Sequence, residues 1–169
     1  IIGILAVALV PRLTGGPARA RDAERKADLQ QIATALEFYA NDNSGSYPST
    51  PATFCISSLV LGTYLTTVPT DPSNPTAAIG TGFCASGYTY KGLNTDADPN
   101  VEGYLLIADL ETESDRANAG VYRKDTVVGA TYSSSLSIAA SGFLGTTFTT
   151  CTSTTTCASA SDVVLVVGR

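Results

Sequence analysis

The sequence predicts an α+β fold in which a long N-terminal helix packs on an antiparallel β-sheet head. From residue 18 to about residue 41, apolar side chains recur at the helical spacings of three and four, at Leu29, Ile32, Leu36 and Tyr39. Short apolar or alternating runs at 88–91, 101–111, 142–151 and 162–167 are typical of strands. Because the helix comes first and the strands follow, we expect the helix to lie across one face of the sheet.

Residues 1–17 are expected to form an apolar stem. Its uncharged side chains are the expected buried core of an assembly: Ile1, Ile2, Ile4, Leu5, Val7, Leu9 and Val10. Proline and glycine weaken helices, so helix breaks are expected at Gly3, Pro11, Gly15, Gly16 and Pro17. The run is shorter than the roughly 20 residues that span a bilayer. The apolar region of a signal peptide is the alternative, although this run leads into a charged helix rather than a cleavage site.

Three regions therefore follow one another along the chain. The stem covers residues 1–17, the amphipathic helix and its cap cover 18–46, and a β-rich head with two disulfides covers 47–169. Asn and Gly at 41–46 favour the end of a helix. Within the head, repeated prolines limit regular structure, and residues 56–65 are expected to form one short helix.

The composition excludes several classes of function. The chain contains no His, which removes Ser-His-Asp and Cys-His catalysis as well as Cys₂His₂ zinc sites. Acids and bases balance up to residue 42, so the formal net charge of −5 lies after residue 47. An acidic head lacks the electrostatic footprint of a nucleic-acid binder. We expect no nucleic-acid binding by a single chain.

The cysteines predict two disulfides in an oxidising compartment, because their number is even and their spacing is wide. Four cysteines, Cys55, Cys84, Cys151 and Cys157, allow three pairings. Cys151 and Cys157 enclose a short loop that a hairpin could close, which leaves Cys55 to pair with Cys84.

Two groups of carboxylates are candidate sites, although both are more typical of solvated loops. The first is a weak calcium candidate whose oxygen ligands lie at alternate positions: Asp96, Asp98, Asn100 and Glu102. Pro99 interrupts this run. The paired carboxylates of a glycosidase could be drawn from Asp109, Glu111, Glu113 and Asp115. We expect neither a resident cofactor nor enzymatic activity.

Two further expectations concern the helix surface. Asp22 and Lys26 are four residues apart, a spacing that predicts an ion pair on exposed turns. The aromatic residues Phe38, Tyr39 and Tyr47 are expected to cover the core where the helix meets the head.

The run IIGILAVALVP at 1–11 and the helix end LEFYANDNSGSYP at 36–48 resemble the N-terminal region of bacterial type IV pilins and the related type II secretion pseudopilins. The elements YLTTVPTDPSNP at 64–75, YTY at 88–90 and YLLIADLE at 104–111 are similar to the head domain of that family. Past residue 120 the resemblance is architectural only.

The resemblance implies a structural subunit that polymerises with copies of itself into an extracellular pilus filament serving adhesion, motility or DNA uptake. In that family a prepilin peptidase exposes a mature N-terminus that is then methylated, and inner-membrane machinery moves the subunit from the membrane into the filament. About eleven mature residues would precede Ile1, extending the apolar run to the roughly 20 that span a membrane. The family's glutamate at the fifth mature position would lie among them. The alternatives are a type II secretion pseudopilin and, from another class, a membrane-anchored secreted enzyme or tip adhesin.

Overall fold

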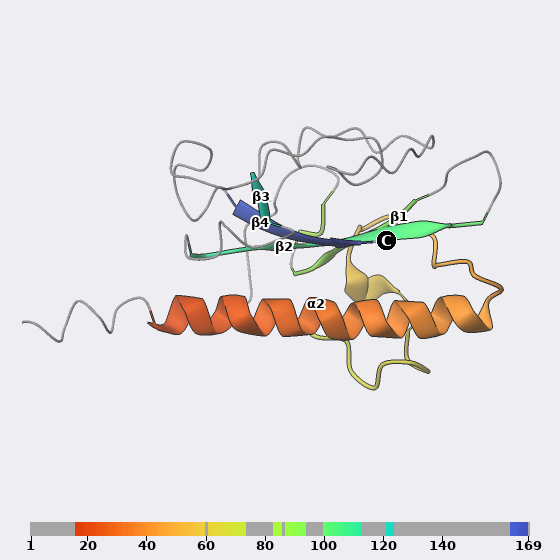
Figure 1. Ribbon diagram of the computed structural model, residues 1–169, viewed down its shortest axis with the longest axis horizontal. Coiled ribbons are helices and arrows are strands. Elements are labelled where there is room, and N and C mark those ends of the chain that lie inside the picture. Colours follow the sequence, from red (N-terminus) through yellow and green to blue (C-terminus); the bar gives the residue numbers. More distant parts are fainter. Residues whose placement is uncertain are drawn as a thin grey trace, which may run out of the picture.

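The computed structural model describes residues 16–59, 61–73, 83–85, 87–93, 100–112, 121–123 and 163–168. The long helix α2 (Gly16–Asp42) lies along an antiparallel sheet (Figure 1). The sheet consists of β1 (Thr89–Leu93), β2 (Gly103–Asp109), β3 (Val121–Arg123) and β4 (Val163–Gly168). The predicted α+β class, with an N-terminal helix packed on an antiparallel sheet, is confirmed in this part of the chain.

Helix α2 begins two residues before the expected start at Ala18. Gly16 and Pro17 lie in its first turn, where proline is tolerated because its missing N–H would have no partner inside the helix. At the other end, Ser44 and Gly45 adopt positive φ angles of 58° and 88°. The amide of Gly45 donates to the carbonyl of Ala40 at 2.7 Å, which closes the helix with a left-handed turn. The expected breaks at Gly3, Pro11 and Gly15 lie outside the described residues.

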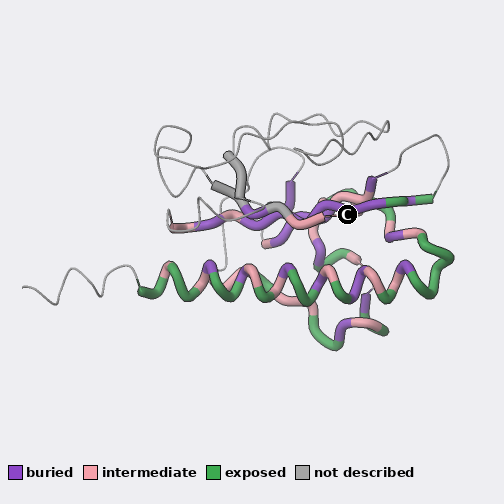
Figure 2. Tube along the Cα trace, in the orientation of Figure 1, coloured by how far each residue is buried: buried purple, intermediate pink, exposed green. Residues whose placement is uncertain are grey.

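The core lies between α2 and one face of the sheet. The predicted apolar stripe of the helix is turned towards the sheet (Figure 2), and Leu29, Ile32 and Leu36 are fully buried. Every second residue of β2 packs against this stripe, because successive side chains in a strand point to opposite faces of the sheet. The resulting cluster includes Leu29, Ile32, Leu36, Ala40, Tyr88, Tyr90, Tyr104, Leu106, Ala108 and Leu110.

Strands β2 and β4 are the two inner strands, in the order β1-β2-β4-β3, and every neighbouring pair is antiparallel. The register places Tyr90 opposite Leu106 and Leu106 opposite Val167. Residues on both faces of β2 are buried, which explains its almost continuous apolar sequence. The VVLVV run at 163–167 forms β4 and pairs with β2 and β3, and its Leu165 is buried in the core.

The outer edge of β1 is covered by the segment that follows the helix. The amide of Tyr90 donates to the carbonyl of Phe54 at 2.8 Å, and the amide of Gly92 donates to the Thr50 hydroxyl at 2.9 Å. An isolated bridge joins Cys55 to Thr89. This cover satisfies backbone groups that would otherwise be open to pairing with another chain.

Two local expectations need correction. Phe38 does not cover the core: it is 59% exposed, because a side chain two positions from Leu36 points to the opposite side of a helix with 3.6 residues per turn. Tyr39 and Tyr47 do pack at the helix–head junction, in edge-to-face contacts with Tyr64 and Tyr104 respectively. The short helix expected at 56–65 is limited to one 3₁₀ turn, η1 (Ile56–Ser58).

Replacing Gly92 with Ala should destabilise the fold by about 1–3 kcal/mol, the usual cost of overpacking. A Cβ at this position would lie 2.7 Å from the carbonyl oxygen of Pro48 and 2.8 Å from a methyl group of Val101. Gly62→Ala is the matched control, since nothing lies within 4 Å of its added Cβ. Chemical denaturation would measure both changes, and equal midpoints for the two variants would contradict this packing.

Candidate functional site

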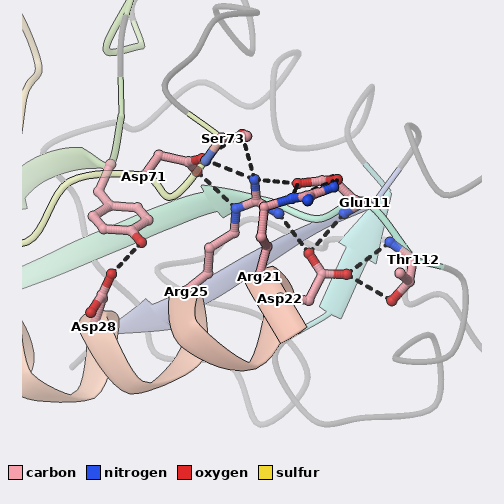
Figure 3. A network of polar contacts seen from close by, with 9 residues as sticks. Arg21, Asp22, Arg25, Asp28, Asp71, Ser73, Glu111 and Thr112 are labelled. Carbon is pink, nitrogen blue, oxygen red and sulfur yellow. Dashed lines mark hydrogen bonds and ion pairs between the residues drawn. The ribbon is translucent and has the colours of Figure 1, made fainter. Parts of the chain in front are cut away.

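A buried cluster of charges joins the N-terminal half of α2 to the head (Figure 3). Arg25 lies at its centre, with a side chain only 3% exposed. Its guanidinium donates to Asp22 at 2.7 Å, to Asp71 at 2.8 Å and to Glu111 at 2.6 Å. The Ser73 hydroxyl lies 2.8 Å from the same group. Three carboxylates from three chain segments therefore converge on one arginine.

Asp22 connects the helix to the end of β2. Its carboxylate accepts hydrogen bonds from the backbone amides of Glu111 and Thr112, at 2.9 and 2.8 Å, and from the Thr112 hydroxyl at 2.7 Å. The residue is completely buried. We expected Asp22 on an exposed turn; it instead caps the residues that follow β2. A buried carboxylate is stable here because Arg25 and three donors of the head hold its charge.

The electrostatics of the cluster favour ionised carboxylates. Hydrogen bonding from Arg21, at 2.9 Å, is the main cause that lowers the pKa of Glu111 below its ordinary value of 4.5, with a further contribution from Arg25. Burial alone would raise the pKa of Asp71, but hydrogen bonds from Arg25 and Ser73 outweigh it and lower this pKa below its ordinary value of 3.8.

This arrangement is suited to fastening chain segments together. A glycosidase acid needs a raised pKa so that it holds a proton at neutral pH, whereas the pKa of Glu111 is lowered and its oxygens are bound to arginines. Asp109 is half-buried at the end of β2. Glu113 and Asp115 lie outside the described residues.

Tyrosine hydroxyls of the head extend this fastening along the helix. Tyr88 donates to Asp28 at 2.6 Å, and Tyr64 donates to Asp42 at 3.0 Å. Tyr47 donates to Glu37 at 3.1 Å. Burial, reinforced by the hydrogen bond to Asp28, raises the pKa of Tyr88 and keeps it protonated. The polar flanks of α2 are thus tied to the head from the arginine cluster to the helix end.

The Cys55–Cys84 disulfide is present and confirms that predicted pairing. Cys55 directly follows Phe54, whose φ of 58° is unusual for a large side chain and costs on the order of 1–3 kcal/mol. The bond therefore lies beside a backbone held in a strained conformation. Cys151 and Cys157 lie outside the described residues.

The remaining predicted site residues are only partly placed. Asn100 and Glu102 of the calcium candidate are exposed, whereas Asp96 and Asp98 lie outside the described residues. Within the described ranges, no group of three or more His, Cys, Asp or Glu side chains is arranged to hold a metal ion. The stem residues from Ile1 to Val10 also lie outside. In the part of the chain with described structure, no helix combines the length and apolarity of a membrane span.

The charged cluster escaped the sequence analysis although the sequence carried a signal for it. Asp22 and Arg25 continue the spacing of three and four that Leu29, Ile32 and Leu36 establish. Extending the apolar stripe towards the N-terminus would have placed both charges on the buried face. Their partners Asp71 and Glu111 are 46 and 86 residues away from Arg25 along the chain, and no local pattern connects them to it.

Comparisons of the chain with models of known protein families, with curated proteins and with solved structures found no match.

Replacing Arg25 with Met should lower the free energy of unfolding by about 3–5 kcal/mol, because Asp22 would remain buried without its cationic partner. Arg19→Met removes a charge from an exposed position of the same helix and should change stability by no more than about 0.5 kcal/mol. Urea denaturation of both variants measures the difference. A small effect at Arg25, equal to that at Arg19, would show that the cluster does not hold the helix.

Acidification should destabilise the chain through Glu111 and Asp71. Because their pKa values are lower in the folded state, the stability they confer is complete above their ordinary values of 4.5 and 3.8 and is lost as pH falls through the folded values. Arg21→Met should make this loss shallower by allowing the pKa of Glu111 to rise. Thermal unfolding from pH 6 downwards tests it, with Arg19→Met as control; identical acid profiles in all three proteins would refute the link.

Proposed function

We propose that the chain is the structural subunit of an extracellular filament of the type IV pilus kind, with α2 and the apolar stem in the filament core and the head outside. The supporting observation is the surface of α2 that faces away from the sheet (Figure 2). Across residues 25–41, the exposed positions of the helix carry no charge: Ala27, Gln30, Gln31, Thr34, Phe38 and Asn41.

An uncharged exposed face is unusual for a helix at the surface of a head this acidic. The outer face of a helix that stays in water normally carries charged or polar residues, and Phe38 is the one large apolar side chain that is exposed among the described residues. At 1.5 Å per residue, the uncharged face is about 25 Å long. Small side chains such as Ala27 allow two helices to approach closely, and Phe38 offers an apolar side chain to bury between them.

The opposite face of α2 supports the same function. The arginine cluster and the tyrosine hydroxyls fix the helix to the head, so a load on the helix is transmitted to the head without separating the two. Fixing one face in this way also leaves the other face always presented in the same orientation. Repeated copies can then pack with a constant geometry, which a regular filament requires.

The apolar stem supplies the second contact. Residues 1–10 contain no charged side chain, and their burial against other copies is favourable by about 25 cal/mol per Å² relative to water. In a membrane, or in a filament core, the same side chains meet apolar surroundings. The proposed sequence of locations is therefore the inner membrane before assembly and the extracellular filament afterwards.

Phe38→Asp and Ile4→Asp should each abolish filaments while leaving the head folded. A carboxylate placed in an apolar contact costs far more than the contact gains unless it is paired. Ser57→Asp, which adds the same charge at an exposed position of η1, is the matched control and should assemble normally. Electron microscopy of sheared surface material is the measurement, and circular dichroism checks folding. Normal filaments from either core variant would refute the proposed packing.

A further inference from the structure

The segment 50–56 covers the outer edge of β1 through its backbone. The amide of Tyr90 donates to the carbonyl of Phe54 at 2.8 Å, and the amide of Ile56 donates to the carbonyl of Tyr88 at 3.1 Å. Alternate residues of a strand present their N–H and C=O groups to the same edge. The backbone groups of residues 88, 90 and 92 therefore point to this edge.

The cover is thin, because few of its residues are held by packing. Gly92 is bonded to a side chain only: its amide and its carbonyl lie 2.9 and 3.2 Å from the Thr50 hydroxyl. Thr50, Ala52 and Thr53 are exposed, and Ile56 is the one buried residue between 50 and 56. Segments with little buried apolar surface are the ones that open locally at low cost.

The disulfide ties this cover to the strand beneath it. Cys55 is joined to Cys84, which is 29 residues further along the chain. The amide of Cys84 donates to the hydroxyl of Thr89 in β1 at 2.9 Å. Next to the bond, Phe54 has a φ of 58°, a conformation that a non-glycine residue keeps only when its surroundings impose it. The strain at Phe54 therefore favours opening once the covalent connection is removed.

We propose that the Cys55–Cys84 disulfide is a redox-controlled latch on the β1 edge. Its reduction releases the segment 50–56, and the freed edge pairs with the same edge of a second copy of this chain. Unpaired strand edges are templates for pairing with another chain, so the oxidised and reduced forms differ in what they can bind.

The reductant is a dithiol. One of its thiolates attacks the Sγ atom of Cys55, which is half-buried, whereas Cys84 is buried. The S–S bond breaks, and Cys84 leaves as a thiolate that takes up a proton. The second thiolate of the dithiol then displaces Cys55 from the mixed disulfide. Both cysteines end as thiols, and the dithiol ends as a disulfide.

The freed edge is complementary to itself. A twofold axis at Tyr90 sets this residue opposite its own copy and residue 88 opposite residue 92, so the outward N–H and C=O groups of the two chains meet. The same register places Lys91 opposite Thr89 of the second copy. Two lysines therefore do not face each other, and like charges in that position would oppose pairing.

The double variant Cys55→Ser with Cys84→Ser removes the latch and leaves the other two cysteines in place. It is made in the full chain together with Ile4→Asp, which prevents association through the apolar stem. Hydrogen exchange followed by NMR should show the amide of Tyr90 exchanging at least about tenfold faster in dilute solution than in the disulfide-bonded Ile4→Asp parent. Unchanged exchange at Tyr90 in the folded variant would overturn the proposal.

The matched control is Cys151→Ser with Cys157→Ser in the same parent, which should leave the exchange of Tyr90 unchanged. If the variant without the latch does not fold, reduction of the folded parent by a dithiol replaces it. Every comparison is made between chains that carry Ile4→Asp, so the result does not depend on the proposed filament packing.

The pairing itself is tested by concentration. Light scattering should show the latch variant passing from monomer to dimer as its concentration rises, while the amides of Tyr90 and Gly92 regain protection from exchange. The disulfide-bonded parent should remain a monomer. A latch variant that stays monomeric, or a dimer in which these two amides still exchange rapidly, would contradict pairing at the β1 edge.

Discussion

The burial of Arg25 is the constraint on which the arrangement of helix and head depends. A guanidinium that is 3% exposed must be surrounded by acceptors, because an unpaired buried charge is prohibitively costly. Its partners come from the helix itself, from the loop at 71–73 and from the residues after β2. These segments are far apart in sequence, so satisfying one side chain fixes the axial position of α2 against the sheet. Apolar packing alone is non-directional and would tolerate sliding.

This one-sided attachment determines what the helix can do. The polar contacts described above lie on the sheet-facing half and flanks of α2, and they leave the uncharged exposed positions of residues 25–41 available. A subunit of a filament needs both properties: a rigid connection between the polymerising element and the head, and a contact surface presented in a constant orientation. The tyrosine hydroxyls bound to Asp28, Glu37 and Asp42 extend the rigid connection to the helix end.

The sequence was sufficient for the features that depend on local periodicity. The stripe at Leu29, Ile32 and Leu36 predicts the buried face of α2, and the runs around 88–91, 101–111 and 162–167 predict β1, β2 and β4. The pairing of Cys55 with Cys84 followed by elimination. The helix begins two residues before its predicted start at Ala18, because proline is acceptable in the first turn of a helix.

The features that depend on distant contacts could not be predicted in the same way. Asp22 looked like half of a surface ion pair, because its true partners, the amides of Glu111 and Thr112, are brought to it only by the tertiary fold. The contacts of Lys91 with the rings of Phe54 and Phe83 have the same origin: these two residues are 29 positions apart in sequence, as are the cysteines that follow them. The expectation that Phe38 covers the core was wrong for a different reason, since its angular position on the helix, opposite Leu36, already indicated exposure.

The accessibility of Phe38 before and after assembly tests the central claim most directly. Hydroxyl-radical footprinting would compare the aromatic ring in dispersed subunits with the same ring in purified filaments, using Tyr64 of the head as an internal reference. If the outer face of α2 forms the filament core, oxidation of Phe38 should fall strongly on assembly, because a side chain that is 59% exposed would become buried at a contact. Equal oxidation of Phe38 in the two states would contradict the proposed packing of the helix.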